Sequence, residues 1–174
     1  ENIRMAKRLE KLGKREEDLG HRETAADYYF RAVLFHVAAA WGIFDSDDAE
    51  LIWLTDKIRS DFDKVIQYSP YPMERVEIPF EGKSLPGILS LTPSRQKAPT
   101  ILCVPGMDLH KENAINHMNN PYIRRGMNSL AIDGPGQGES LLREIWVNEE
   151  NYGRAGKAAI DYLVNRPEVD AEKI

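Results

Sequence analysis

A change of hydrophobic period between Tyr68 and Pro72 divides this chain into two differently patterned parts. Before this segment, apolar residues recur three, four and seven positions apart, which is typical of amphipathic helices. After it, Val76, Ile78 and Phe80 alternate with Glu77 and Pro79, which is typical of a half-buried strand. Because two prolines in three residues cannot continue a helix, we expect a helical domain over residues 1–70 and a second domain over residues 71–174.

The second part is predicted to alternate strands with helices. A two-stranded hairpin comes first, and two continuous apolar runs that follow it have the character of strands buried on both faces. This order predicts an α/β fold with a mainly parallel sheet, in which the hairpin strands are followed in space by the fourth strand and then the third. The expected strands are Val76–Phe80, Leu85–Leu91, Thr100–Val104 and Asn128–Ile132, and the expected helices are Glu112–Arg125 and Tyr152–Asn165.

The composition excludes several classes of protein. The chain has 174 residues, of which 42% are hydrophobic and 29% charged, and its net charge of −5 argues against a nucleic-acid partner. No apolar run approaches the roughly 20 residues of a membrane span. The single cysteine, Cys103, is expected to be a core thiol, and no Cys/His set has zinc-ligand spacing. We therefore expect a cytoplasmic protein with no metal and no organic cofactor.

Two glycine-containing loops follow the buried strands, where sites gather in open α/β sheets. The first, Pro105–Glu112, turns sharply and can point backbone N–H groups outward, as an oxyanion site requires. A plain turn between strand and helix is the equally good alternative. The second loop, Asp133–Ser140, lacks the lysine of a P-loop and the glycine order of a dinucleotide fingerprint, so nucleotide binding is not expected.

The two loops and the element order resemble the first half of an α/β-hydrolase. More narrowly, Pro105-Gly-Met-Asp-Leu-His-Lys-Glu together with Asp133-Gly-Pro-Gly-Gln-Gly-Glu is similar to the 2,6-dihydroxypseudooxynicotine hydrolase group and its esterase relatives. The resemblance covers nearly the whole chain. It implies a helical cap domain at residues 1–70, followed at residues 71–174 by the N-terminal part of the hydrolase core.

The resemblance also implies chemistry that this chain does not carry. Such enzymes use a Ser–His–acid triad with the serine on a G-x-S-x-G elbow, and no such motif occurs here. Gly136-Gln-Gly-Glu-Ser has its serine in the wrong place. The strand leading to the elbow is expected to begin around Val169–Ile174, so that the triad lies beyond the chain, which by itself is expected to be a fragment without activity.

Two site residues follow from the resemblance. Met107 matches the position whose backbone N–H helps to form the oxyanion hole, and Glu112 matches a carboxylate that supports activity. At the start of a helix the positive dipole end would keep Glu112 charged, and we expect the side chain to lie at a cleft and to accept a hydrogen bond from the substrate. The alternative is that Glu112 is only a helix-end residue.

The expected function of the whole protein is hydrolysis of a small carbonyl substrate, either an ester or a ketone cleaved at a carbon–carbon bond. Serine would attack the carbonyl, and no cofactor would be needed. The expected partner is this small molecule, with a homodimer left open and with neither nucleic acid nor membrane involved. A non-catalytic helical interaction module on an α/β scaffold is the competing hypothesis.

Overall fold

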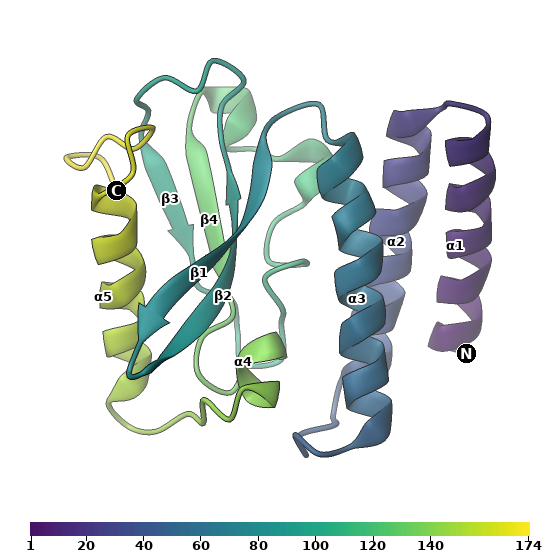
Figure 1. The fold of residues 1–174 in the computed structure, drawn as a ribbon, viewed down its shortest axis with the longest axis horizontal. Coiled ribbons are helices and arrows are strands. Elements are labelled where there is room, and N and C mark those ends of the chain that lie inside the picture. The colour runs from purple at the N-terminus through teal and green to yellow at the C-terminus, as the bar shows by residue number, and fades with distance from the viewer. The chain divides into compact units, whose positions relative to one another are not determined.

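The computed structural model describes all 174 residues and divides into two compact units, Glu1–Pro70 and Tyr71–Ile174. The first unit contains helices only, and the second contains a four-stranded sheet with helices (Figure 1). This is the α/β arrangement expected from the sequence, with the helical part first. No helix combines the length and the apolar character that crossing a membrane requires.

The helical unit consists of α1 (Asn2–Asp18), α2 (Arg22–Ala40) and α3 (Ala49–Tyr68). In Figure 1 the three helices run side by side, with α2 between α1 and α3. Asp48 caps α3, because its carboxylate accepts hydrogen bonds from the N–H groups of Glu50 and Leu51. The buried apolar side chains that hold the unit together include Tyr29, Phe30, Val33, Leu54, Ile58, Phe62 and Val65.

The sheet consists of β1 (Met73–Phe80), β2 (Lys83–Ser90), β3 (Thr100–Cys103) and β4 (Asn128–Ile132), in the spatial order β1-β2-β4-β3. The predicted order is therefore confirmed. The β1–β2 and β2–β4 pairs are antiparallel, and β3 pairs with β4 in parallel. The expectation of a mainly parallel sheet is therefore wrong for these four strands, because β2 of the hairpin pairs with both of its neighbours in antiparallel fashion.

A tight turn at Glu81 and Gly82 joins the two strands of the hairpin. Both residues have positive φ angles, 48° and 77°, and such backbone suits the right-handed twist of the strands that it connects. Glycine at the second position adopts this conformation without steric cost.

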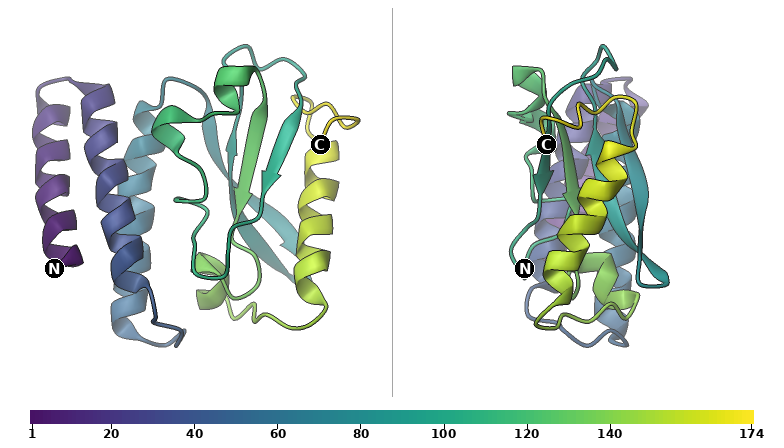
Figure 2. Two further views of the ribbon diagram at one scale, coloured as in Figure 1. Left: turned by 180° about the vertical axis from the view of Figure 1, so that it is seen from behind. Right: turned by 90° about the vertical axis from the view of Figure 1, so that its left-hand side faces the viewer.

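Helix α5 (Asn151–Val164) packs on the sheet through Ala155, Ala159 and Leu163, which are buried with apolar residues of β1, β2 and β4 (Figure 2). The helix itself is the one predicted over Tyr152–Asn165. After α5 the chain returns to the edge of the sheet, where Val169 forms a parallel bridge with Ala98, just before β3.

The edge strand β3 is less buried than its sequence predicts. Ile101, Leu102 and Cys103 are only half-buried, and Val104 is 41% exposed. Cys103 is half-buried within these residues, because its strand is the outermost of the four. Burial still raises the pKa of the thiol.

The predicted helix over Glu112–Arg125 is wrong. The segment forms turns and two short 3₁₀ helices, His117–Asn119 and Ile123–Arg125. Asparagine side chains explain the difference, because they bind nearby backbone N–H groups in place of helical carbonyls. Asn113 accepts from the His110 N–H at 2.8 Å, and Asn120 accepts from the Tyr122 N–H at 3.0 Å.

Candidate active-site loops

The loops that follow β3 and β4 leave the sheet at the same end, the carboxyl end of the two strands, because these strands are parallel neighbours. Gln137 joins them. Its Nε2 donates to the carbonyl oxygens of Pro105 at 2.9 Å and Gly106 at 2.6 Å, while its Oε1 accepts from the Gly134 N–H at 2.7 Å. The side chain is 1% exposed, so these bonds form away from bulk solvent. Gln137 therefore fixes the position of the Pro105–Gly106 turn.

Met107 lies at the exposed tip of this turn. The Leu109 N–H donates to the Gly106 carbonyl at 3.0 Å and closes the turn around Met107, whose side chain is 65% exposed. The Met107 N–H has no hydrogen-bond acceptor within the chain. A rigidly held, unpaired backbone donor after a β-strand is the type of group that an oxyanion hole uses.

Lys111 is the centre of a buried charge cluster behind this turn. Its ammonium lies 2.8 Å from Asp133 Oδ2, 2.7 Å from Glu139 Oε1 and 3.0 Å from Glu112 Oε1. Lys111, Glu112 and Asp133 are each 1% exposed or less. Arg75 of β1 adds a second cation, with Nη1 3.2 Å from Glu112 Oε1 and 3.7 Å from Glu139 Oε1.

Electrostatics keep the members of this cluster charged in spite of their burial. Burial favours the neutral amine of Lys111, but Asp133, Glu112 and Glu139 outweigh that effect and raise its pKa. Burial likewise favours the protonated acid at Glu112, but the positive charges of Lys111 and Arg75 hold its pKa below the usual range. The ions of the cluster therefore stabilise one another, and the charge of each depends on the presence of the others.

Glu112 is placed differently from the sequence-based interpretation. It does not begin a helix, and so a helix dipole is not what keeps it charged. The side chain is 1% exposed within this chain, whereas a cleft position was expected. Its Oε1 is bound by Lys111 and Arg75, but its Oε2 is buried and has no hydrogen-bond partner. One acceptor atom of Glu112 is thus left unused.

Asp133 and the loop after it form a motif that the sequence shows, but the sequence did not predict that Asp133 binds the loop after β3. Asp133 accepts from the Lys111 N–H at 2.7 Å and from the Glu139 N–H at 3.0 Å, in addition to the Lys111 ammonium. Gly138 has a φ of 41°, and a Cβ atom there would lie 2.4 Å from Asp133 Oδ2. Only glycine permits so close an approach of the backbone to the carboxylate, so Gly138 is the residue of this loop from which the contact could have been predicted.

Ser140 is excluded as a nucleophile by its surroundings. It is fully buried, and its Oγ donates to the Asp133 carbonyl at 2.7 Å. This agrees with the sequence argument that the serine of Gly136-Gln-Gly-Glu-Ser is misplaced for an elbow. The imidazole of His117 is 1% exposed and lies with Nε2 3.4 Å from the Lys111 carbonyl.

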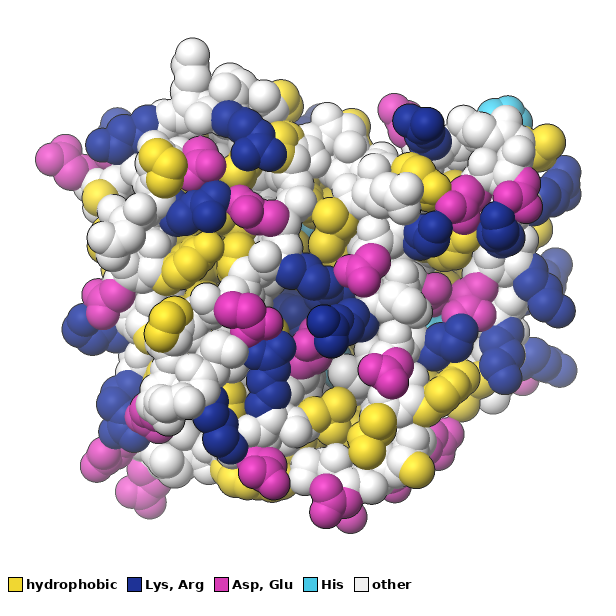
Figure 3. Space-filling model, viewed as in Figure 1, with side chains coloured by type: hydrophobic (Ala, Val, Ile, Leu, Met, Phe, Trp, Pro, Cys, Tyr) yellow, Lys and Arg dark blue, Asp and Glu magenta, His cyan; other side chains and the backbone are white.

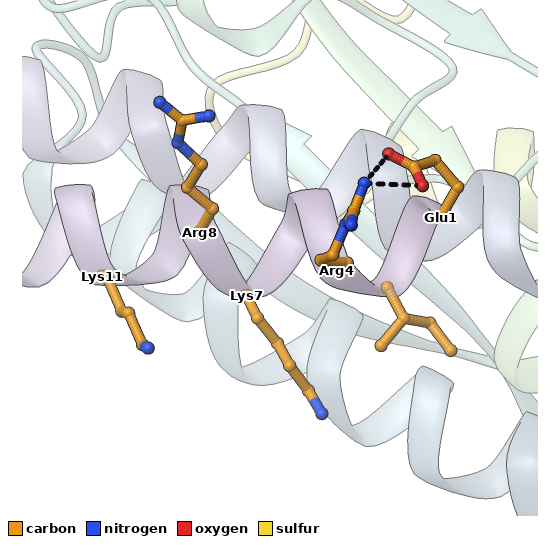
Figure 4. Close-up of a pocket in the computed structure, with 6 residues that line it drawn as sticks. Glu1, Arg4, Lys7, Arg8 and Lys11 are labelled. Atoms are coloured by element: carbon orange, nitrogen blue, oxygen red, sulfur yellow. Dashed lines mark hydrogen bonds and ion pairs between the residues drawn. The ribbon is translucent and has the colours of Figure 1, made fainter.

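A groove along α1 is the second candidate for a binding site. It is lined by Glu1, Ile3, Arg4, Lys7, Arg8 and Lys11. Lys and Arg side chains gather on the α1 side of the face shown in Figure 3. In Figure 4, however, Arg8 points away from Lys7 and Lys11, and Arg4 is paired with Glu1 at 2.7 Å. The cations do not converge on a common point, so the groove is not a binding site of defined geometry.

The fold of this chain matches that of part of a solved hydrolase. It superposes on the crystal structure of 2,6-dihydroxy-pseudo-oxynicotine hydrolase with a TM-score of 0.82 and 23% sequence identity, over 99% of this chain and 48% of that one. AbyA5 is a more distant structural neighbour, with a TM-score of 0.61 and 19% identity over 94% of this chain and 45% of that one.

The chain belongs to the FrsA-like esterase family, whose profile matches residues 10–174. It is 31% identical to the alpha/beta hydrolase xenA of Xenoacremonium sinensis, over 91% of this chain and 38% of that protein. It is 20% identical to the esterase FrsA of Photobacterium profundum, over 96% and 39% respectively. The resemblance stated from the two loop motifs is thereby confirmed. The chain spans about two fifths of the length of these curated relatives.

Proposed function

We propose that the whole protein is a serine-nucleophile hydrolase that cleaves an ester or a ketone carbon–carbon bond in a small carbonyl substrate. The family supports the hydrolase class. The observation that carries the finer proposal is the Met107 N–H, which is unpaired on a turn fixed by Gln137. Residues 1–70 would form the cap domain and residues 71–174 the first part of the catalytic core.

In the proposed mechanism, a serine outside this chain attacks the substrate carbonyl. The serine proton passes to the triad histidine, also outside this chain, and the carbonyl oxygen becomes an oxyanion that receives a hydrogen bond from the Met107 N–H. Collapse of the tetrahedral intermediate breaks the bond to the leaving group, which takes the proton from the histidine and departs as an alcohol or as the protonated carbon fragment. Water then hydrolyses the acyl-enzyme by the same route and releases the carboxylic acid and the free serine. Preorganised donors of this kind act without reorganisation during the reaction. No organic cofactor or metal ion takes part in these steps.

Glu112 has a different role in the proposal. Its carboxylate is already neutralised by Lys111 and Arg75, and the pKa of Glu112 is held low, so the residue is a poor proton acceptor. The unused Oε2 can still accept a hydrogen bond. We assign it to a hydroxyl or N–H of the substrate, or to a water that carries a proton, whose position it would fix.

The test requires the full-length protein. We expect a G-x-S-x-G motif within about ten residues after Ile174, covalent labelling of its serine by a fluorophosphonate, and turnover of small aryl esters or β-diketones that disappears when this serine is changed to alanine. A full-length protein that lacks the motif, resists the fluorophosphonate and hydrolyses neither substrate class would contradict the proposal and favour the interaction module.

A further inference from the structure

Three ionisable side chains, one from each helix, meet inside the helical unit. They are Glu10 of α1, His36 of α2 and Asp61 of α3, and their nearest ligand-type atoms all lie within 4.8 Å of one another. His36 Nε2 is 3.3 Å from Glu10 Oε1 and 3.6 Å from Asp61 Oδ2. His36 is fully buried and Asp61 is 6% exposed, while Glu10 reaches partway to solvent.

Hydrogen bonding accounts for only part of this arrangement, namely the contact of His36 Nε2 with Glu10 Oε1. Asp61 Oδ2 is buried and has no hydrogen-bond partner, although it faces the imidazole of His36. Leaving a buried polar atom unpaired costs about 1–3 kcal/mol, and more when the group is charged. Most buried polar atoms in proteins therefore have a partner. An unpaired carboxylate oxygen directed at a histidine nitrogen points to a ligand that both atoms could share.

The distances from His36 Nε2 to the two carboxylate oxygens fit a tetrahedral metal ion. Zinc bonds to nitrogen and carboxylate oxygen are about 2.0–2.2 Å long, which places neighbouring ligands of a tetrahedron roughly 3.4 Å apart. The two distances from His36 Nε2, 3.3 and 3.6 Å, lie on either side of that value. We propose that Glu10, His36 and Asp61 bind a divalent first-row transition metal ion, of which Zn²⁺ is the representative.

The chemistry of the donors agrees with this assignment. One imidazole and two carboxylates are ligands that Zn²⁺ takes in proteins, and three protein ligands leave a fourth position for water. The His36 ring is oriented by Trp53, which meets it edge to face at a centroid distance of 5.9 Å. The ion would reach the site along Glu10, whose side chain is 19% exposed.

Lys57 is the competitor of the proposed ion. Its ammonium lies 3.0 Å from Glu10 Oε1 and supplies the positive charge that the carboxylate needs. The charge of Lys57 also acts on Asp61, but burial and the negative charge of Glu10 outweigh it and raise the pKa of Asp61 to about 8. A divalent ion would displace the proton that this shift favours and bind both carboxylates, while the long, 35% exposed Lys57 side chain moves into solvent. Lys7, whose ammonium lies 5.5 Å from the centre of the Trp53 ring, adds a further positive charge that opposes the ion.

Removal of individual ligands tests the site in the full chain after treatment with a chelator. We expect Zn²⁺ at low-micromolar free concentration to raise the melting temperature, and Co²⁺ to bind in a one-to-one ratio with the intense visible bands of a tetrahedral site. Asp61→Asn is nearly isosteric, so it should fold but lose both responses, and His36→Gln should do the same. His21→Gln and Cys103→Ala are the matched controls, and both should respond like the unaltered chain.

Lys57→Met provides a test that does not depend on a destabilising change. Removing the competing ammonium should tighten Zn²⁺ binding by about tenfold or more. The proposal fails if the unaltered chain shows no Zn²⁺ response, if Asp61→Asn responds equally, or if Lys57→Met does not bind more tightly. A more stable Asp61→Asn variant in a chain that ignores Zn²⁺ would show that the cluster is only a buried carboxyl–histidine contact. None of these outcomes depends on hydrolase activity.

Discussion

Lys111 binds Asp133 twice, through its ammonium at 2.8 Å from Oδ2 and through its backbone N–H at 2.7 Å from Oδ1. The two residues belong to the loops after β3 and β4, so this double contact ties one loop to the other at the edge of the sheet. Both side chains are buried. The contact therefore holds the Met107 turn from behind, while Gln137 holds it through the carbonyls of Pro105 and Gly106.

Replacing Lys111 tests how much stability this contact supplies. Lys111→Met keeps most of the side-chain volume but leaves Glu112, Asp133 and Glu139 buried without their shared cation. Breaking a buried ion pair from one side costs about 3–5 kcal/mol, and urea denaturation monitored by circular dichroism would measure it. Lys157→Met removes a lysine from an exposed pair with Asp161 and should have no measurable effect. Equal stability of the two variants would contradict a central role of Lys111.

The sheet could be predicted from the sequence because its signals are local. Each signal spans only a few residues: the period-two alternation in β1, the apolar runs in β3 and β4, and the turn at Glu81–Gly82. The order β1-β2-β4-β3 follows from these elements and from the rules that govern the connections between strands. The resemblance to the hydrolase family added the prediction that the turn at Met107 belongs to the site. Both the local patterns and the family motifs depend on residues that are close together in the sequence.

The charge cluster could not be predicted, because its members are distant in sequence. Lys111 and Asp133 are 22 residues apart, and Arg75 approaches from another strand. From the sequence, Glu112 is expected at the start of a helix and at a cleft, with no indication of the distant charges around it. The helix itself fails because asparagine side chains compete for its backbone N–H groups, an effect that depends on side-chain conformation and not on hydrophobic period.

Gln137 offers a test of the loop arrangement that preserves side-chain shape. Gln137→Glu replaces the amino group that serves the Pro105 and Gly106 carbonyls with an oxygen that would face them. We expect the turn to shift and turnover by the full-length protein to fall at least tenfold, equivalent to about 1.4 kcal/mol in activation free energy. The steady-state kcat of the variant measures this. Gln96→Glu, in an exposed loop, should leave kcat unchanged.

His117 predicts a specific loss of stability in mild acid. Burial lowers the pKa of His117 from its ordinary 6.5 to about 4, so between these values the unfolded chain binds a proton that the folded chain does not. Stability must then fall as the pH decreases from 6.5 to 4, by roughly 3 kcal/mol for this shift. Urea denaturation at a series of pH values would show the loss, and His117→Gln should reduce it by the share of His117, while burial also lowers the pKa of His36, which contributes in the same direction. The exposed His21→Gln variant should retain it.

Met107 can be tested at the backbone. Met107→Pro removes the N–H that is assigned to the oxyanion and should lower kcat of the full-length protein about 10²–10³-fold, as loss of one oxyanion donor does in other enzymes. Met107→Leu keeps the N–H and an exposed apolar side chain, and its kcat should be close to that of the unaltered protein. If both variants lose activity equally, the side chain matters and the N–H assignment is wrong.

Glu112→Gln separates a substrate-binding role from a purely structural one. The change keeps the shape and one acceptor oxygen but removes the charge that pairs with Lys111 and Arg75. Because Glu112 is buried, we expect some loss of stability, smaller than for Lys111→Met, since Lys111 retains Asp133 and Glu139. We also expect turnover to fall at least tenfold, about 1.4 kcal/mol, at temperatures where the variant is fully folded. Glu139→Gln removes a carboxylate from the same cluster and serves as the control for stability. If Glu112→Gln shows a lower melting temperature with unchanged kcat and KM, Glu112 only stabilises the fold, and its assignment to the site fails.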